Sequence, residues 1–68
     1  MQEGDTVYFY VENIVNGKFV PKLVKAEIVN KSASENRIVV KNRSYGFRVF
    51  TYSDIGTKLL SENHKKFI

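Results

Sequence analysis

The chain lacks cysteine and tryptophan altogether, and its 68 residues include one histidine and one proline. Without cysteine it can form no disulfide, and a single histidine cannot complete an ordinary structural zinc site, so we expect no metal and no cofactor. No apolar run approaches the roughly 20 residues that span a bilayer. The N-terminal residues 1–5 are polar and acidic, unlike a signal peptide. We therefore expect a cytoplasmic chain with no membrane segment.

The residues that are present predict one small folded domain, 1–68. Hydrophobic side chains make up 43% of the chain and charged ones 26%, proportions that are ordinary for a globular protein and argue against disorder. A chain of this length buries only about 60% of its unfolded surface. Because neither a disulfide nor a metal adds stability, packing, closure of the fold or a partner must supply it.

Runs of β-branched and aromatic residues between turn residues predict a mainly β fold. The expected strands are 6–12, 23–30, 37–41, 45–52 and a short one at 58–60. Four or five antiparallel strands joined by tight turns predict a small barrel, because closure removes the open sheet edges that aggregate. After the last strand, Ser61 is a good N-cap for a short C-terminal helix that carries His64 and Phe67.

Alternation along the strands predicts which side chains form the core. The aliphatic face of the first two strands comprises Val7, Phe9, Val11, Val24, Ala26 and Ile28. Tyr8 and Tyr10 lie on the opposite face, where a ring can stay half-exposed while its hydroxyl bonds water. In the fourth strand the pattern alone selects neither face. We assign Phe47 and Val49 to the core because Arg48 must reach water.

The clearest local signal is the dipeptide Asn16-Gly17, which suits a two-residue type I′ turn because both central positions require positive φ. The flanking residues would then pair, Val15 opposite Lys18 and Ile14 opposite Phe19. Pro21 cannot donate to a β-ladder, so it marks an edge, a bulge or a bend. We expect a projecting first hairpin, separated from the sheet near Asn13 and Pro21.

Two segments resemble known small proteins. The SH3-like small barrels, among them KOW and Tudor domains, share the opening Gly4-Asp5-Thr6-Val7-Tyr8, a long first hairpin and two long strands before two short ones. Small proteins of low-GC Gram-positive bacteria and their phages are similar in their closing segment to residues 54–61, Asp-Ile-Gly-Thr-Lys-Leu-Leu-Ser. The resemblance implies a fold and a source, since that group has no settled function to carry over.

The net charge of +4 lies wholly in the second half of the chain. Residues 1–34 carry four basic and four acidic side chains, whereas residues 35–68 carry seven basic and three acidic ones. Such a local excess attracts polyanions, with an effect that salt weakens. The alternative is an ordinary solvated hairpin face, because a net charge of about 2–8 is usual for a soluble small domain.

We expect no catalysis. The chain has no cysteine nucleophile and no glycine-rich phosphate loop, and each of its four glycines is explained by a turn. His64 is most simply a residue at the surface of the expected helix, with no nucleophile beside it. The sequence therefore favours a binding module over an enzyme.

Two binding functions remain open. The favoured one is protein–protein interaction or self-association through the first hairpin and the exposed tyrosines, because exposed apolar patches mark contacts. Its candidate residues are Tyr8, Tyr10, Ile14, Val15, Phe19 and Val20. The same hairpin residues could instead fold over the barrel as a lid. The alternative function is binding of single-stranded DNA or RNA, in which cations follow the phosphates and rings stack on the bases. Its candidate residues are Arg37, Lys41, Arg43, Arg48, Tyr45 and Tyr52.

Overall fold

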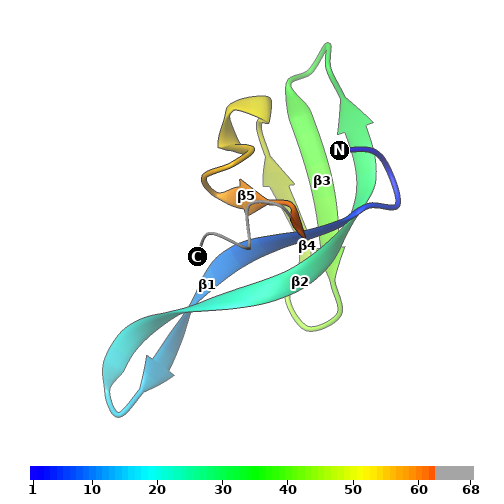
Figure 1. The fold of residues 1–68 in the computed structure, drawn as a ribbon. Helices are drawn as coiled ribbons and strands as arrows, with labels where there is room; N and C mark the ends of the chain where they lie inside the picture. The colour runs from blue at the N-terminus through cyan, green and yellow to red at the C-terminus, as the bar shows by residue number, and fades with distance from the viewer. Residues whose placement is uncertain (63–68) are drawn as a thin grey trace.

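A computed structural model describes residues 1–62 of the chain, and these residues form one antiparallel sheet (Figure 1). Its strands are β1 (Thr6–Val15), β2 (Lys18–Ser32), β3 (Arg37–Asn42), β4 (Gly46–Phe50) and β5 (Leu59–Leu60). The strands lie in the order β4-β3-β2-β1-β5. The prediction of a mainly β chain with five antiparallel strands is confirmed.

The prediction of a closed barrel is wrong. β4 and β5 lie at the two opposite edges of the sheet, and no pairing joins them. Closure fails because β5 has only two residues, which pair with Tyr8 and Phe9 of β1. Between β4 and β5 the chain leaves the sheet through a single 3-10 turn, Tyr52–Asp54. The sheet is therefore open.

The long strand β2 changes partner along its length. Its first part pairs with β1, and its last part pairs with β3 after a register shift between Ile28 and Asn30. Such a bulge bends a strand and increases its twist. The bend curls the sheet, so that the rings of Phe9 in β1 and Phe50 in β4 meet with their centroids 5.6 Å apart.

The core lies on the inner face of this curled sheet. The predicted core residues of β1 and β2 are all buried, so that assignment is confirmed. The remaining buried residues of the core cluster are Ile38, Val40 and Leu59. Because direct partners in an antiparallel ladder lie on one face, the pair Ile28–Val40 joins the two halves of the core.

The core assignment of β4 is wrong. Phe47 and Val49 are exposed to 65% and 63%, whereas Phe50 packs against the core. Arg48 pairs with Val40 on the inner face, and its guanidinium lies 5.8 Å from the centroid of the Phe9 ring. An arginine can lay its aliphatic stem over an apolar surface while the charged end stays in water. The need of Arg48 for water therefore does not place it on the outer face.

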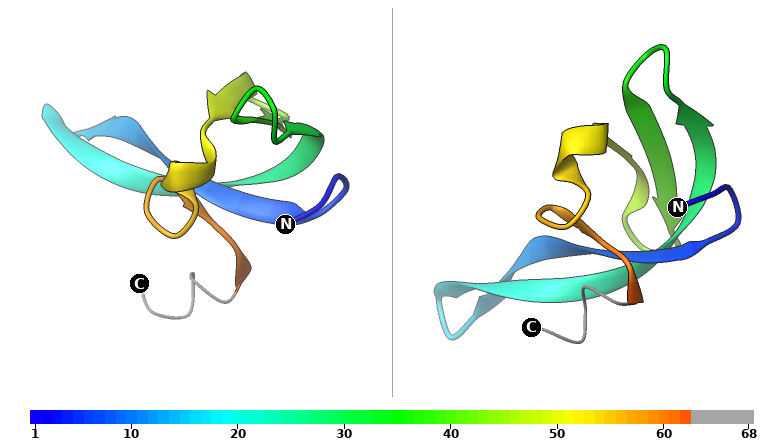
Figure 2. Two further views of the ribbon diagram at one scale, coloured as in Figure 1. Left: turned by 90° about the horizontal axis from the view of Figure 1, so that it is seen from above. Right: turned by 45° about the horizontal axis from the view of Figure 1, so that its top comes forward.

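The first hairpin has the predicted turn. Asn16 and Gly17 have φ values of 52° and 78°, and the two expected pairs close the hairpin. The ladder runs without interruption through Asn13 and Pro21, so the predicted separation there is wrong. Figure 2 shows from two further sides that the hairpin nevertheless extends away from the rest of the sheet.

The C-terminal helix expected from Ser61 falls almost entirely on residues 63–68, outside the described residues. Within residues 1–62 the only helical element is the 3-10 turn before β5. The Thr51 N–H donates to the Asp54 carboxylate at 2.9 Å, which fixes the start of that turn.

Candidate functional site

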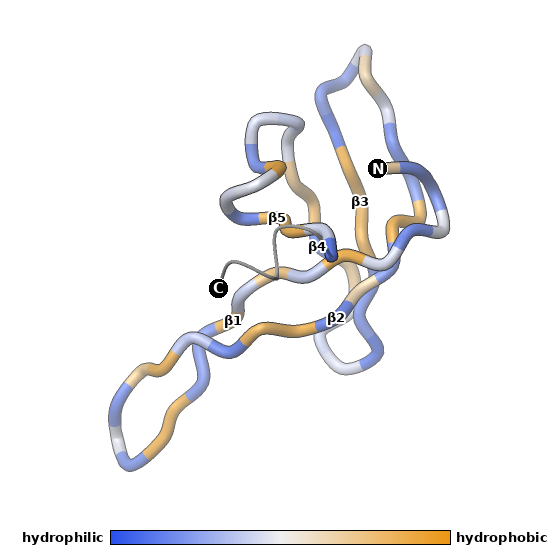
Figure 3. Tube along the Cα trace, in the orientation of Figure 1, coloured by the Kyte–Doolittle hydropathy of each residue, from blue (hydrophilic) through white to orange (hydrophobic). Residues whose placement is uncertain are grey.

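The first candidate surface is the far end of the β1–β2 hairpin, residues 13–20, here named the hairpin tip. Four apolar side chains of the tip are exposed: Ile14 to 65%, Val15 to 46%, Phe19 to 70% and Val20 to 42%. The buried core ends at Val11 in β1 and Val24 in β2. Figure 3 shows apolar residues on both strands of the tip. The tip therefore does not fold over the sheet as a lid.

Contacts at the two ends of the β1–β2 ladder show which residues of β1 direct their backbone N–H and C=O groups toward β2. In an antiparallel ladder, alternate residues bond to one neighbour, and the residues between them point their N–H and C=O to the other side. The Ile28 N–H donates to the Asp5 carbonyl at 3.0 Å, and a two-residue turn is closed by its flanking pair, Val15–Lys18. Both observations place the hydrogen bonds to β2 on the odd-numbered residues of β1.

The even-numbered residues of β1 therefore face away from β2. Among the described strands, only β5 pairs with that side, and it stops at Tyr8 and Phe9. The N–H and C=O groups of Tyr10, Glu12 and Ile14 face outward beyond it, and we name these three residues the open edge of β1. An unpaired strand edge of this kind is a template for another strand.

The opposite edge of the hairpin, on β2, is blocked in two ways. Pro21 pairs with Glu12, so its ring nitrogen points outward, where it offers no N–H to a further strand. Lys25 also faces outward, and its carbonyl already accepts a hydrogen bond of 2.7 Å from the Asn42 side-chain amide. Strand addition is therefore favoured on the β1 side alone.

The two tyrosines predicted beside the hairpin differ in accessibility. Tyr10 is exposed to 41% and lies at the open edge of β1. Tyr8 is only 8% exposed, and its hydroxyl donates to the Glu62 carboxylate. The difference arises because Tyr8 pairs with Leu60 of β5, whereas no residue of β5 lies opposite Tyr10. Tyr10 can contact a partner, whereas Tyr8 is part of the packed structure.

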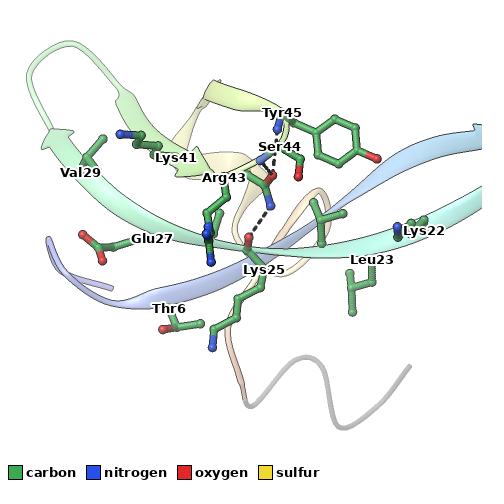
Figure 4. A pocket seen from close by; sticks show the side chains of 13 residues that line it. Thr6, Lys22, Leu23, Lys25, Glu27, Val29, Lys41, Arg43, Ser44 and Tyr45 are labelled. Carbon is green, nitrogen blue, oxygen red and sulfur yellow. Dashed lines mark hydrogen bonds between the residues drawn. The ribbon is translucent and has the colours of Figure 1, made fainter.

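The second candidate surface is a groove of about 980 Å³ between β2 and the β3–β4 turn, here named the basic groove (Figure 4). Its volume is at the upper end of the roughly 300–1,000 Å³ that is usual for ligand pockets. The cationic side chains that line it are Lys22, Lys25, Lys41 and Arg43. Glu27 is the single carboxylate in its lining, so positive charges exceed negative ones by three.

One side chain holds the β3–β4 turn over β2. The Asn42 side-chain oxygen accepts from the N–H groups of Ser44 and Tyr45 at 2.7 and 2.9 Å, and its amide donates to the carbonyl of Lys25. An Asx side chain commonly closes a turn in this way, because it replaces a backbone partner. Figure 4 shows the Arg43 side chain extending from this turn toward β2. Two hydrogen bonds therefore fix the shape of the turn, and the third fixes where the backbone of Arg43 and Tyr45 lies relative to β2.

Within residues 1–62, none of the cations of the basic groove forms an ion pair. The one ion pair within residues 1–62 joins Arg37 to Glu35 at 2.9 Å, away from the groove. The Lys41 ammonium lies 5.5 Å from the centroid of the exposed Phe47 ring. These charges are thus free to meet an anion from solution.

The structure divides the residues that were predicted for nucleic-acid binding. Lys41, Arg43 and Tyr45 come together in the basic groove. Arg37 is held by its ion pair, and Arg48 lies on the inner face over a core ring.

Tyr52 also lies outside the basic groove. It packs against the core, and its hydroxyl is buried without a hydrogen-bond partner among residues 1–62. The Lys31 ammonium lies 6.0 Å from the centroid of its ring. A base could not stack on a ring placed in this way.

Sequence reasoning missed the contribution of β2 to the groove. Lys22 and Lys25 lie in the half of the chain whose net charge is zero, so a count along the sequence does not single them out. Alternation along β2 places Lys25 on the face opposite Val24 and Ala26. Its position beside the β3–β4 turn requires the register of β2 against β3, which no local pattern supplies.

Other kinds of site were also sought in the structure. In the part of the chain that the structure describes, no group of three or more histidine, cysteine, aspartate or glutamate side chains could hold a metal ion. Residues 1–62 also contain no helix that is long and apolar enough to cross a membrane.

Comparisons with protein-family models, curated proteins and solved structures return no match for this chain. The resemblance to SH3-like barrels and to small Gram-positive and phage proteins therefore stays a prediction. The function has to be argued from the hairpin tip and the basic groove themselves.

Proposed function

We propose that this chain is a small non-enzymatic binding module that holds a protein through the hairpin tip and the open edge of β1. The observation that carries the proposal is the exposure of four apolar side chains, to between 42% and 70%, at a tip that the core does not cover. Apolar side chains gathered in this way commonly mark a contact surface. Binding would remove them from water.

The open edge suggests how the partner binds. A strand that pairs with Tyr10, Glu12 and Ile14 gains backbone hydrogen bonds, which supply affinity without regard to sequence. The side chain of Ile14 lies opposite Phe19 on the same face as that of Tyr10, because residues two apart in a strand share a face. This face would contact alternate side chains of the added strand. The expected partner is therefore an extended segment with apolar residues at every second position.

The blocked edge of β2 limits the assembly. Pro21 offers no N–H in the middle of that edge, so pairing of a second strand on the β2 side is interrupted there. A second copy of this hairpin, placed antiparallel on the first, satisfies the same requirements as a strand of another protein. Self-association and partner binding are thus two uses of one surface.

The test measures both self-association and partner binding. The oligomeric state is measured by sedimentation equilibrium from about 10 µM to about 1 mM, the range of weak protein contacts. In parallel, peptides are selected on the purified chain from a random display library. We expect either a dimer or extended peptides with alternating apolar residues. In both cases amide exchange at Tyr10, Glu12 and Ile14 should slow on binding.

Two serine substitutions locate the contact. Phe19→Ser should weaken binding about tenfold or more, because burying a phenylalanine side chain contributes about 1.5–3 kcal/mol. Phe47→Ser is the matched control, since Phe47 is exposed to 65% on another part of the sheet and should leave binding unchanged. A chain that stays monomeric and selects no peptide contradicts the proposal, as does a ligand that tolerates Phe19→Ser.

A further inference from the structure

The lining of the basic groove contains no residue of the hairpin tip. It gathers most of the excess positive charge of the chain, four cationic side chains against one carboxylate, from two regions that lie far apart in the sequence. None of these cations forms an ion pair within residues 1–62. An exposed tyrosine ring, Tyr45, stands at the same groove.

We propose that the basic groove binds single-stranded nucleic acid, with phosphates beside Lys25, Lys41 and Arg43 and a base stacked on the ring of Tyr45. This is a second function, independent of the protein contact at the hairpin tip. Cations that follow the phosphates and a ring that receives a base are the two parts that single-strand binding requires.

The phosphate part of the argument rests on position and on charge. Arg43 belongs to a turn that two hydrogen bonds to Asn42 close and that a third, from Asn42 to the Lys25 carbonyl, attaches to β2, so its backbone is placed near Lys25 before any ligand arrives. A backbone that is already in place needs less ordering when a ligand binds. The absence of internal partners in the described residues also means that no ion pair must be broken.

The base part rests on Tyr45. Its side chain is exposed to 40%, and its backbone N–H donates to Asn42, so the backbone is held in place and the ring is open to solvent. A base can stack on such a ring only when it is free of its own neighbours, which favours a single strand over a duplex. An acidic protein segment would also be attracted to the cations, but its carboxylates would not stack on the ring of Tyr45.

Binding is measured by fluorescence anisotropy with an end-labelled oligothymidylate of about 12 nucleotides, within the site sizes known for single-strand binders. Neutralisation of three phosphates predicts a slope of log affinity against log salt of about −2. The affinity should therefore fall about 20-fold between about 50 and 200 mM salt. A duplex of the same length should bind more weakly than the single strand.

Substitutions separate the phosphate contacts from the base contact. The double variant Lys41→Ala with Arg43→Ala should bind about tenfold or more weakly and reduce the salt slope to about −0.7. Tyr45→Ala should bind about fivefold or more weakly with the salt slope unchanged, because it removes stacking and no charge. Circular dichroism verifies that each variant is folded.

The matched control is Lys18→Ala with Lys58→Ala, which removes the same charge at exposed positions outside the groove lining. Equal weakening in the control and in the groove variant would overturn the proposal in favour of unspecific charge attraction. Failure to bind the oligonucleotide at about 50 mM salt would also overturn it, because phosphate binding is strongest at low salt.

Two further outcomes bear on the identity of the ligand. Equal affinity for polyglutamate would overturn the assignment to nucleic acid, and so would a Tyr45→Ala variant that binds as wild type. Phe19→Ser should bind the oligonucleotide as wild type does. A failure of the hairpin-tip proposal therefore leaves this result unaffected.

Discussion

The hairpin tip and the basic groove both depend on β2, but opposite kinds of interaction form them. The tip offers exposed apolar side chains and an open backbone edge, and its residues are contiguous in the sequence. The groove offers charges and one ring, and a side-chain hydrogen bond between Asn42 and Lys25, 17 residues apart, holds it together. Salt should therefore separate the two surfaces, because it weakens charge attraction and leaves apolar contact nearly unchanged.

The comparison also shows how two binding surfaces can coexist on so small a sheet. The tip lies beyond the last core residues, so changes there do not disturb packing. The lining of the groove includes Val24 and Ala26 of the core, but its four cationic side chains are all exposed. Substitutions should therefore damage one surface at a time.

The largest separating effect is expected from Asn42→Ala. It removes two hydrogen bonds that close the β3–β4 turn and one that holds the turn on β2, at a cost of about 1–3 kcal/mol in the free energy of unfolding. Oligonucleotide binding should weaken about tenfold or more, because Arg43 and Tyr45 are no longer held in place. Chemical denaturation and anisotropy measure the two effects.

The control in the same turn is Ser44→Ala. Ser44 contributes its backbone N–H to Asn42, and this bond survives the substitution. The free energy of unfolding of the Ser44→Ala variant should differ from that of the wild type by less than about 0.5 kcal/mol. If Asn42→Ala and Ser44→Ala bind the oligonucleotide equally well, the groove does not depend on a fixed turn.

A smaller effect, confined to the other region, is expected from Gly17→Ala. Gly17 has a φ of 78°, and a Cβ added there would meet no atom within 4 Å, so the cost is backbone strain alone. That strain amounts to about 1–2 kcal/mol for a residue other than glycine. Protein binding at the tip should weaken while oligonucleotide binding stays unchanged.

Asn16→Gly is the matching control, because glycine adopts the φ of 52° at that position without strain. Its stability should equal that of the wild type within about 1 kcal/mol, the entropic cost of an added glycine. Denaturation curves for both variants, combined with amide exchange at the tip, would show whether the loss is local. Loss of groove binding in Gly17→Ala would mean that the two surfaces are coupled.

These differences explain what the sequence could predict. The tip depends on a dipeptide and its immediate neighbours, so Asn16-Gly17 was enough to predict both the turn and the pairs beside it. Alternation likewise predicted the core of β1 and β2, because each strand has one aliphatic face. Both features are local, and local geometry is what a sequence pattern encodes.

The groove and the sheet closure depend on contacts between distant segments. Lys25 meets the β3–β4 turn only because of the register of β2 against β3, which no local pattern sets. The sheet does not close because β5 pairs with β1 alone and lies at the edge opposite β4, a placement that no local pattern sets. The face of β4 was misassigned because Arg48 and Phe50 share the inner side, where the arginine stem covers Phe9.

The smallest expected effect concerns Arg48, which the sequence grouped with the other cations. Its guanidinium lies over the Phe9 ring, an interaction that contributes about 0.5–1 kcal/mol at an exposed site. Arg48→Leu loses this attraction but keeps apolar cover on the ring, so stability should change by less than about 1 kcal/mol. Oligonucleotide binding should stay within about twofold of wild type, because Arg48 does not line the groove.

Arg43→Leu makes the comparison decisive, since both variants lower the net charge of the chain by one. If binding followed total charge, the two variants would weaken it equally, through the long-range field of the protein. If it follows position, Arg43→Leu alone should lose affinity and reduce the salt slope by about 0.7. Anisotropy titrations at two salt concentrations distinguish these cases, because only a lost phosphate contact changes the slope.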